Sequence, residues 1–167
     1  MSAMRVQALF LLLATALAGC AAFGPPPLQD GASAADVERV LGTPTARYAL
    51  PGGGSRLEHA RGPMGKQTWM VDLDPQGRVT QWFQALTEER LNAYMAVAPG
   101  QTRDELLRTL GRPGEVGHGG VVGGQLWSWR YETNECLWFQ ALINDQQRVV
   151  SAGFGIDWRC DAGDRAR

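Results

Sequence analysis

Histidine and cysteine side chains are the groups in this sequence best suited to nucleophilic or metal chemistry, and the chain has two histidines and three cysteines. A zinc site needs three or four converging protein ligands, and His59 and His118 stand in no cluster with metal-ligand spacing. A nucleophilic thiol needs a nearby base and a lowered pKa, and neither histidine lies beside Cys136 or Cys160 in the sequence. We therefore expect no catalytic residue and no metal site. A hydrolase that uses Cys136 or His118 is kept as an alternative, after the two non-enzymatic functions given at the end of this subsection.

Two glycine-rich stretches lack the spacing of phosphate-binding loops. Gly65-Lys66-Gln67 has neither the upstream glycine nor the Ser/Thr of such a loop. Residues 117–124 precede a predicted strand, whereas the glycines of a dinucleotide site follow one. Sixteen Lys and Arg residues balance seventeen Asp and Glu residues, so no basic excess favours nucleic-acid binding. Both stretches are expected to be connectors, and no enzymatic activity is predicted.

The first twenty residues have the organisation of a bacterial lipoprotein signal. Arg5 precedes an apolar run over residues 6–18, which is too short for a spanning helix and ends in Leu17-Ala18-Gly19-Cys20. This ending resembles a lipobox, in which a signal peptidase cleaves before a cysteine that carries lipid. We predict a signal peptide over residues 1–19 and a covalent lipid on Cys20, with no other cofactor. The alternative is an ordinary signal peptide followed by a chance cysteine.

Residues 20–30 form the predicted linker between the lipid and the folded part. Three consecutive prolines in it favour an extended spacer of about 3 Å per residue. The residue after Cys20 is alanine and not aspartate, which by resemblance to lipoprotein sorting signals favours the outer membrane. In that oxidising compartment we expect Cys136 and Cys160 to form a disulfide worth about 3 kcal/mol. Regular hairpin pairing places Cys160 beyond the partner of Cys136, so this bond requires a bend after Gly155.

The sequence contains an internal repeat, because residues 31–44 align without a gap with residues 100–113. In each copy an N-cap residue, Ser33 or Thr102, precedes a carboxylate by three positions, and the segment ends in Gly-x-Pro. This is the pattern of a short capped helix. Between the two copies, residues 87–97 have acidic residues in a first turn and one apolar stripe, which predicts a further helix.

Alternating apolar and aromatic residues predict three strands after each repeated helix. We predict an α+β fold of two tandem copies, 31–86 and 87–160, each a helix (or helix pair) followed by a three-stranded antiparallel meander, with a polar tail over 161–167. Gly153 and Gly155 are candidates for a β-bulge, because the last strands of the two copies alternate differently. The predicted strands are Arg56–Arg61, Gln67–Asp74, Val79–Ala85, Leu126–Glu132, Glu135–Asn144 and Val149–Ile156.

Alternation also predicts which tryptophans face the core. Trp69 and the matching Phe139 fall on the apolar face of their strands, whereas Trp82 and Trp138 fall on the other phase. If exposed, Trp82 and Trp138 are candidate partner-binding residues, because tryptophan is enriched in interface hot spots. The alternative is that the other repeat covers this face.

Together these features resemble a known family. A lipobox, the pattern Gly-x-Ser/Thr-x-x-(Asp/Glu)-(Val/Leu)-x-x-x-Leu-Gly-x-Pro, aromatic-bearing strands and a terminal hairpin are similar to the SmpA/OmlA (BamE-like) lipoproteins, over most of residues 31–156. The resemblance implies an outer-membrane lipoprotein that faces the periplasm and is not an enzyme. It also implies a role in outer-membrane protein assembly or envelope integrity through protein contacts, with the β-barrel assembly machinery as the candidate partner.

The tandem arrangement leaves a second interpretation open. The SmpA/OmlA module occurs once in the assembly-machine lipoprotein and twice here, so no partner-contacting or lipid-contacting residue is carried over. Tandem helix-plus-meander modules also resemble periplasmic inhibitors of β-lactamase. The alternative function is therefore a periplasmic protein-binding or inhibitory module.

Overall fold

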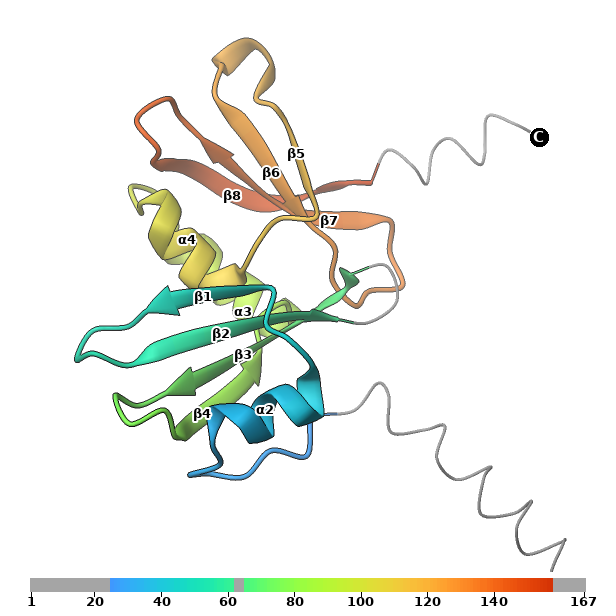
Figure 1. Ribbon diagram of the computed structural model, residues 1–167. Coiled ribbons are helices and arrows are strands. Elements are labelled where there is room, and N and C mark those ends of the chain that lie inside the picture. The colour runs from blue at the N-terminus through green and yellow to red at the C-terminus, as the bar shows by residue number, and fades with distance from the viewer. Residues whose placement is uncertain (1–24, 62–64, 158–167) are drawn as a thin grey trace, which may run out of the picture.

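The chain has an α+β fold, as the sequence predicts. The computed structural model describes residues 25–61 and 65–157. In this part of the chain, three α-helices and one short 3-10 helix accompany two four-stranded antiparallel sheets, ordered β1-β2-β3-β4 and β5-β6-β7-β8 (Figure 1). The elements are α2 (Ala34–Leu41), β1 (Ala46–Ala49), β2 (Ser55–Arg61), β3 (Gln67–Leu73), β4 (Val79–Gln84), α3 (Glu88–Val97), α4 (Arg103–Leu110), β5 (Glu115–His118), η3 (Gly120–Val122), β6 (Gln125–Trp129), β7 (Leu137–Ile143) and β8 (Val149–Ile156).

The two repeated helices begin and end in the same way, as predicted. The hydroxyl of Ser33 accepts a hydrogen bond from the backbone N–H of Asp36, whose carboxylate accepts one from the N–H of Ser33. Thr102 and Glu105 form the same capping box at α4. The residue after each helix is a glycine, with φ of 79° and 81°. Such left-handed backbone ends a helix at little cost only when the residue is glycine.

Each sheet has four strands where the sequence predicted three. The six predicted strands are present, with β6 and β7 each a few residues shorter than expected. The additional strands, β1 and β5, are edge strands of four residues each, and their exposed positions alternate with half-buried ones in β1 only. Neither has the apolar alternation that reveals a half-buried strand. His118, expected in a glycine-rich loop, is the last residue of β5.

The last strand of each sheet has an irregular register at its start. The pairing shifts between Asp72 and Leu73 in the first sheet and between Leu142 and Ile143 in the second. Gly153 and Gly155, the predicted bulge residues, pair in regular register instead. The early shift resolves the conflict of phase, because it places the first residue of each last strand in the core and leaves the second exposed.

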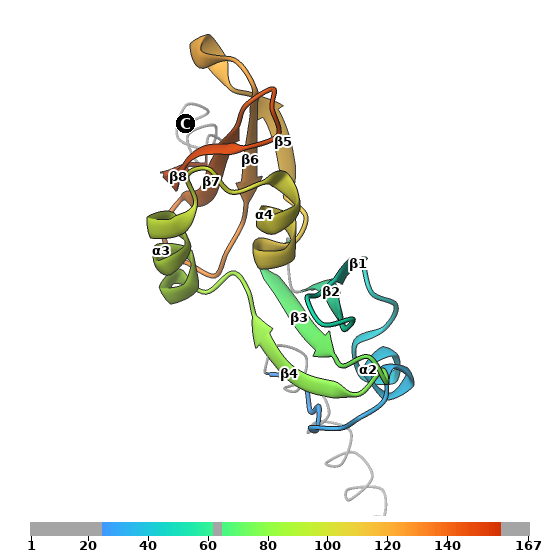
Figure 2. The ribbon, with the colours of Figure 1, turned by 90° about the vertical axis from the view of Figure 1, so that its left-hand side faces the viewer.

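Each sheet has an apolar core of its own. Figures 1 and 2 show α2 beside the N-terminal sheet and the pair α3 and α4 between the two sheets. Every residue of β3 is buried, because both faces of this sheet are covered. The first core consists of Leu28, Val37, Leu41, Leu57, Trp69, Val71, Leu73 and Val79. The second core consists of Leu86, Leu91, Tyr94, Ala98, Leu106, Leu110, Trp127, Trp129, Tyr131, Phe139, Ala141, Ile143 and Val149.

Several predictions concern residues outside the described part. The signal peptide, the lipid site at Cys20, the partner cysteine Cys160 and the tail over 161–167 lie there. The domain boundary between residues 86 and 87 also stays a prediction. In the described ranges, every helix is too short or too polar to cross a bilayer.

Candidate binding groove between the two sheets

A buried carboxylate joins the N-terminal sheet to the end of α4. Glu58 on β2 is fully buried and accepts hydrogen bonds from the hydroxyls of Thr45 (2.9 Å) and Tyr48. It also accepts one from the backbone N–H of Arg112, just after α4, at 3.1 Å. A carboxylate with several donors is well compensated for its burial. This junction fixes the position of α4 on the face of the sheet opposite α2.

A second polar contact lies beside the first. Arg56 binds both carboxylate oxygens of Asp72 on the neighbouring strand, at 2.5 and 2.7 Å. Its remaining terminal nitrogen donates to the carbonyl of Arg108 in the last turn of α4, at 2.8 Å. Burial raises the pKa of Asp72, but the hydrogen bonds from Arg56 and Gln81 outweigh it and hold the pKa below its usual value. The Arg56 charge is therefore neutralised within the fold.

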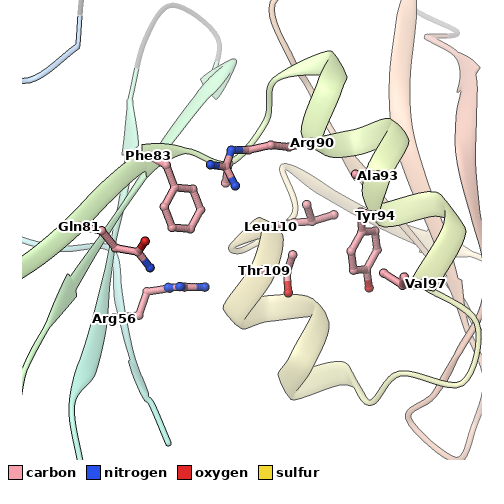
Figure 3. A pocket seen from close by; sticks show the side chains of 10 residues that line it. Arg56, Gln81, Phe83, Arg90, Ala93, Tyr94, Val97, Thr109 and Leu110 are labelled. Atoms are coloured by element: carbon pink, nitrogen blue, oxygen red, sulfur yellow. The ribbon is translucent and has the colours of Figure 1, made fainter.

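An open groove of about 400 Å³ lies next to these contacts. One wall is the N-terminal sheet, the other is α3, and the end of α4 forms the floor, as Figure 3 shows. A volume of this size is within the range of small-ligand sites, about 300–1,000 Å³. The lining residues are Arg56, Gln81, Phe83, Ala85, Arg90, Ala93, Tyr94, Val97, Thr109 and Leu110.

Two guanidinium groups approach the ring of Phe83 in this groove. The Arg90 group lies 4.3 Å from the ring centroid and the Arg56 group 4.9 Å, which is within the range of cation–π attraction. Unlike Arg56, Arg90 is exposed and pairs with no carboxylate among the described residues. The groove thus offers one positive charge that the fold does not neutralise.

Tyr94 supplies a buried polar atom to the opposite wall. Only 3% of its surface is exposed, and its hydroxyl has no hydrogen-bond partner in the described part of the chain. Burial, together with the nearby Glu105 charge, raises the pKa of this hydroxyl, so it stays protonated. Val97, one turn further along α3, is 58% exposed at the end of the groove.

The two histidines lie in different environments, and neither stands in a cluster of reactive groups among the described residues. His59 is 1% exposed, and burial together with the Arg61 charge lowers its pKa to about 4. The ring of His118 is at the surface and accepts a hydrogen bond from the N–H of Gly120 at 3.1 Å. Among the described residues, no three His, Cys, Asp or Glu side chains gather as metal ligands would. Cys136 is disulfide-bonded, and its predicted pairing with Cys160 stays a prediction because Cys160 lies outside the described residues.

The structure leaves neither candidate tryptophan fully exposed: Trp138 is buried and Trp82 is half-buried. Trp138 is 3% exposed, and the guanidinium of Arg130 lies 4.8 Å from its ring. Trp82 is half-buried and packs against the first core. Exposure was the condition for the predicted role of Trp138 in partner binding, and this condition is not met, because its face of the sheet is covered as well. The shifted register of β4 turns Trp82 toward the core side.

The groove itself was missed by reasoning from the sequence. The sequence does show the apolar stripe of α3, to which Tyr94 belongs, and the conflicting phase of β4, to which Phe83 belongs. Neither signal indicates that the two segments face each other, since this depends on how α3 and α4 pack on the N-terminal sheet.

No family model matches this chain, no curated protein matches it significantly, and no solved structure does so either.

Proposed function

We propose that the protein is an outer-membrane lipoprotein that faces the periplasm, has no enzymatic activity, and serves outer-membrane protein assembly or envelope integrity by binding other proteins. In this proposal, lipid on Cys20 confines the module to the membrane. Confinement raises its effective concentration near other envelope proteins. The β-barrel assembly machinery is the candidate partner.

The observation that carries the protein-binding part is the groove. It combines an unneutralised cation at Arg90 with an apolar wall that includes an exposed valine, Val97. Exposed apolar surface next to a fixed charge is typical of recognition sites. Among the described residues that line the groove, no histidine, cysteine or carboxylate side chain could serve as a general base.

The arrangement of elements supports a finer proposal about the fold. Each sheet follows a capped helix of eight residues that ends at a glycine, and each last strand has a register shift at the same place. We propose that both halves are copies of one SmpA/OmlA-like module, which includes a short fourth strand. The tandem copies also support the alternative of an inhibitory module resembling the β-lactamase inhibitors.

Metabolic labelling with a palmitate analogue, followed by fractionation of the membranes, tests the anchor. We expect label in the outer-membrane fraction and loss of both label and membrane association in Cys20→Ser. Soluble, unlabelled wild-type protein contradicts the proposal.

Photo-crosslinking in intact cells tests the partner, with the crosslinker introduced at Val97 and, as a control, at Val116 on β5. Recovery of barrel-assembly proteins from the Val97 position supports the main proposal. Recovery of one soluble periplasmic enzyme supports the alternative, and identical products from both positions argue against the groove as the contact.

A further inference from the structure

We propose that the groove between the N-terminal sheet and α3 binds an extended peptide segment in which one carboxylate side chain lies next to an apolar side chain. This inference deepens the proposed function and rests on its protein-binding part, not on the lipid anchor. The segment would belong to the partner protein.

The charges along the groove set the anionic part of the ligand. Arg56 and Asp72 cancel each other through two hydrogen bonds. The nearby Glu105 is held by the capping box of α4, where its carboxylate accepts from the N–H and hydroxyl of Thr102. Among the described residues that line the groove, Arg90 therefore remains as the single charge available to a ligand. Its stacking on Phe83 restricts its orientation, which lowers the entropy lost when it pairs with a carboxylate.

The opposite wall sets the apolar part. Ala93, Tyr94 and Val97 line this wall along α3, and Leu110 lies at its base (Figure 3). Val97 is more than half exposed although it continues the apolar surface of the groove. An apolar side chain placed here would remove both Val97 and the wall from water, which is favourable at about 25 cal/mol per Å².

Polar atoms along the groove favour a peptide over an acyl chain. One such atom is the amide oxygen of Gln81, a residue that lines the groove. Gln81 uses its amide nitrogen to bind Asp72 at 2.6 Å, so its amide oxygen can accept from a backbone N–H. A peptide backbone can bind this oxygen, whereas a hydrocarbon chain would remove it from water without a partner, at a cost.

The test measures fluorescence anisotropy of a labelled peptide, Gly-Leu-Glu-Leu-Gly, titrated with the full chain, against the same peptide with glutamine in place of glutamate. We expect saturable binding of the glutamate peptide with Kd below about 1 mM. A partly exposed ion pair contributes up to about 1 kcal/mol, so we expect the glutamine peptide to bind about fivefold more weakly.

Matched variants locate the binding. Arg90→Gln should weaken the glutamate peptide about fivefold and leave the glutamine peptide unchanged. Arg103→Gln is the control, because Arg103 is also exposed and stacks on an aromatic ring, at 5.3 Å from Trp127, but lies outside the groove.

The outcomes separate this inference from the anchor. No saturable binding, equal affinity for the two peptides, or equal losses in Arg90→Gln and Arg103→Gln would each overturn the peptide site. Failure of the Cys20 labelling with intact peptide binding would overturn the anchor alone. Circular dichroism of each variant confirms that a loss of affinity is not a loss of folding.

Discussion

A single methyl group added at Gly111 tests whether the polar junction determines how α4 sits on the N-terminal sheet. Gly111 ends α4 with φ of 81°, and a Cβ atom there would lie 3.0 Å from both the Glu58 carboxyl carbon and the Thr68 methyl carbon. Gly42 ends α2 with almost the same φ, 79°, but a Cβ atom there would have nothing within 4 Å. The two glycines therefore differ in their surroundings and not in their backbone.

The expected losses of stability follow from this difference. Gly42→Ala loses stability only because its backbone, with φ 79° and ψ −173°, is essentially restricted to glycine, which costs about 1–3 kcal/mol. Gly111→Ala has the same backbone cost and also displaces buried atoms of Glu58 and Thr68. This overpacking lowers the free energy of unfolding by a further amount of about 1–3 kcal/mol. We therefore expect Gly111→Ala to lose about 1–3 kcal/mol more than Gly42→Ala, with part of this excess recovered when Thr68→Ser removes the opposing methyl group.

Urea unfolding, followed by tryptophan fluorescence and circular dichroism, measures both free energies of unfolding. The slope against urea should not change, because neither variant alters the surface exposed on unfolding. Equal losses for Gly42→Ala and Gly111→Ala would refute the reasoning, since they would show that the end of α4 can move away from Glu58 without cost.

Two further predictions concern the turn between β7 and β8 and the buried histidine, His59. Gln147 has φ of 57° at the turn position where the first sheet has Gly77, with φ of 76°, so Gln147→Gly should raise the free energy of unfolding by up to about 1 kcal/mol in urea titrations, whereas Gln146→Gly should not. The pKa of His59 is lowered in the fold to about 4 from 6.5, so the unfolded chain binds more protons between these values. The contribution of neutral His59 to the free energy of unfolding is therefore complete above pH 6.5. It decreases, by at most about 3 kcal/mol, as the pH falls to 4. His59→Leu should flatten this part of the profile of melting temperature against pH, and an unchanged profile would show that another group titrates there.

The sequence predicted the local structure well where the chemistry is local. Capping boxes at Ser33 and Thr102 involve residues three positions apart, so both helix starts were found. Alternation along β3 and β7 placed Trp69 and Phe139 in the cores. These features depend on neighbouring residues and on one buried face, which the order of residues records directly.

Features that depend on contacts between distant segments were missed. β1 and β5 are held mainly by backbone pairing with one neighbour, so their side chains show little pattern. Burial of Trp138 follows from cover on the second face of its sheet, which alternation alone does not distinguish from exposure, so the sequence left both possibilities open. The groove requires Phe83 and Arg90 to meet across the turn between β4 and α3, and this depends on the contacts of Arg56 and Glu58 with the end of α4.

The separation of the two cores has a consequence for how the chain acquires its structure. The first core uses residues from Leu28 to Val79 and the second those from Leu86 to Val149, and every strand pairs with its neighbour in sequence. Short-range pairing of this kind gives a low contact order, which favours rapid folding. A polypeptide delivered N-terminus first could complete its leading half before the trailing half emerged. Each half would then bury its own core, whereas the face of β3 that carries the fully buried Met70 would be covered only when α3 and α4 pack on it.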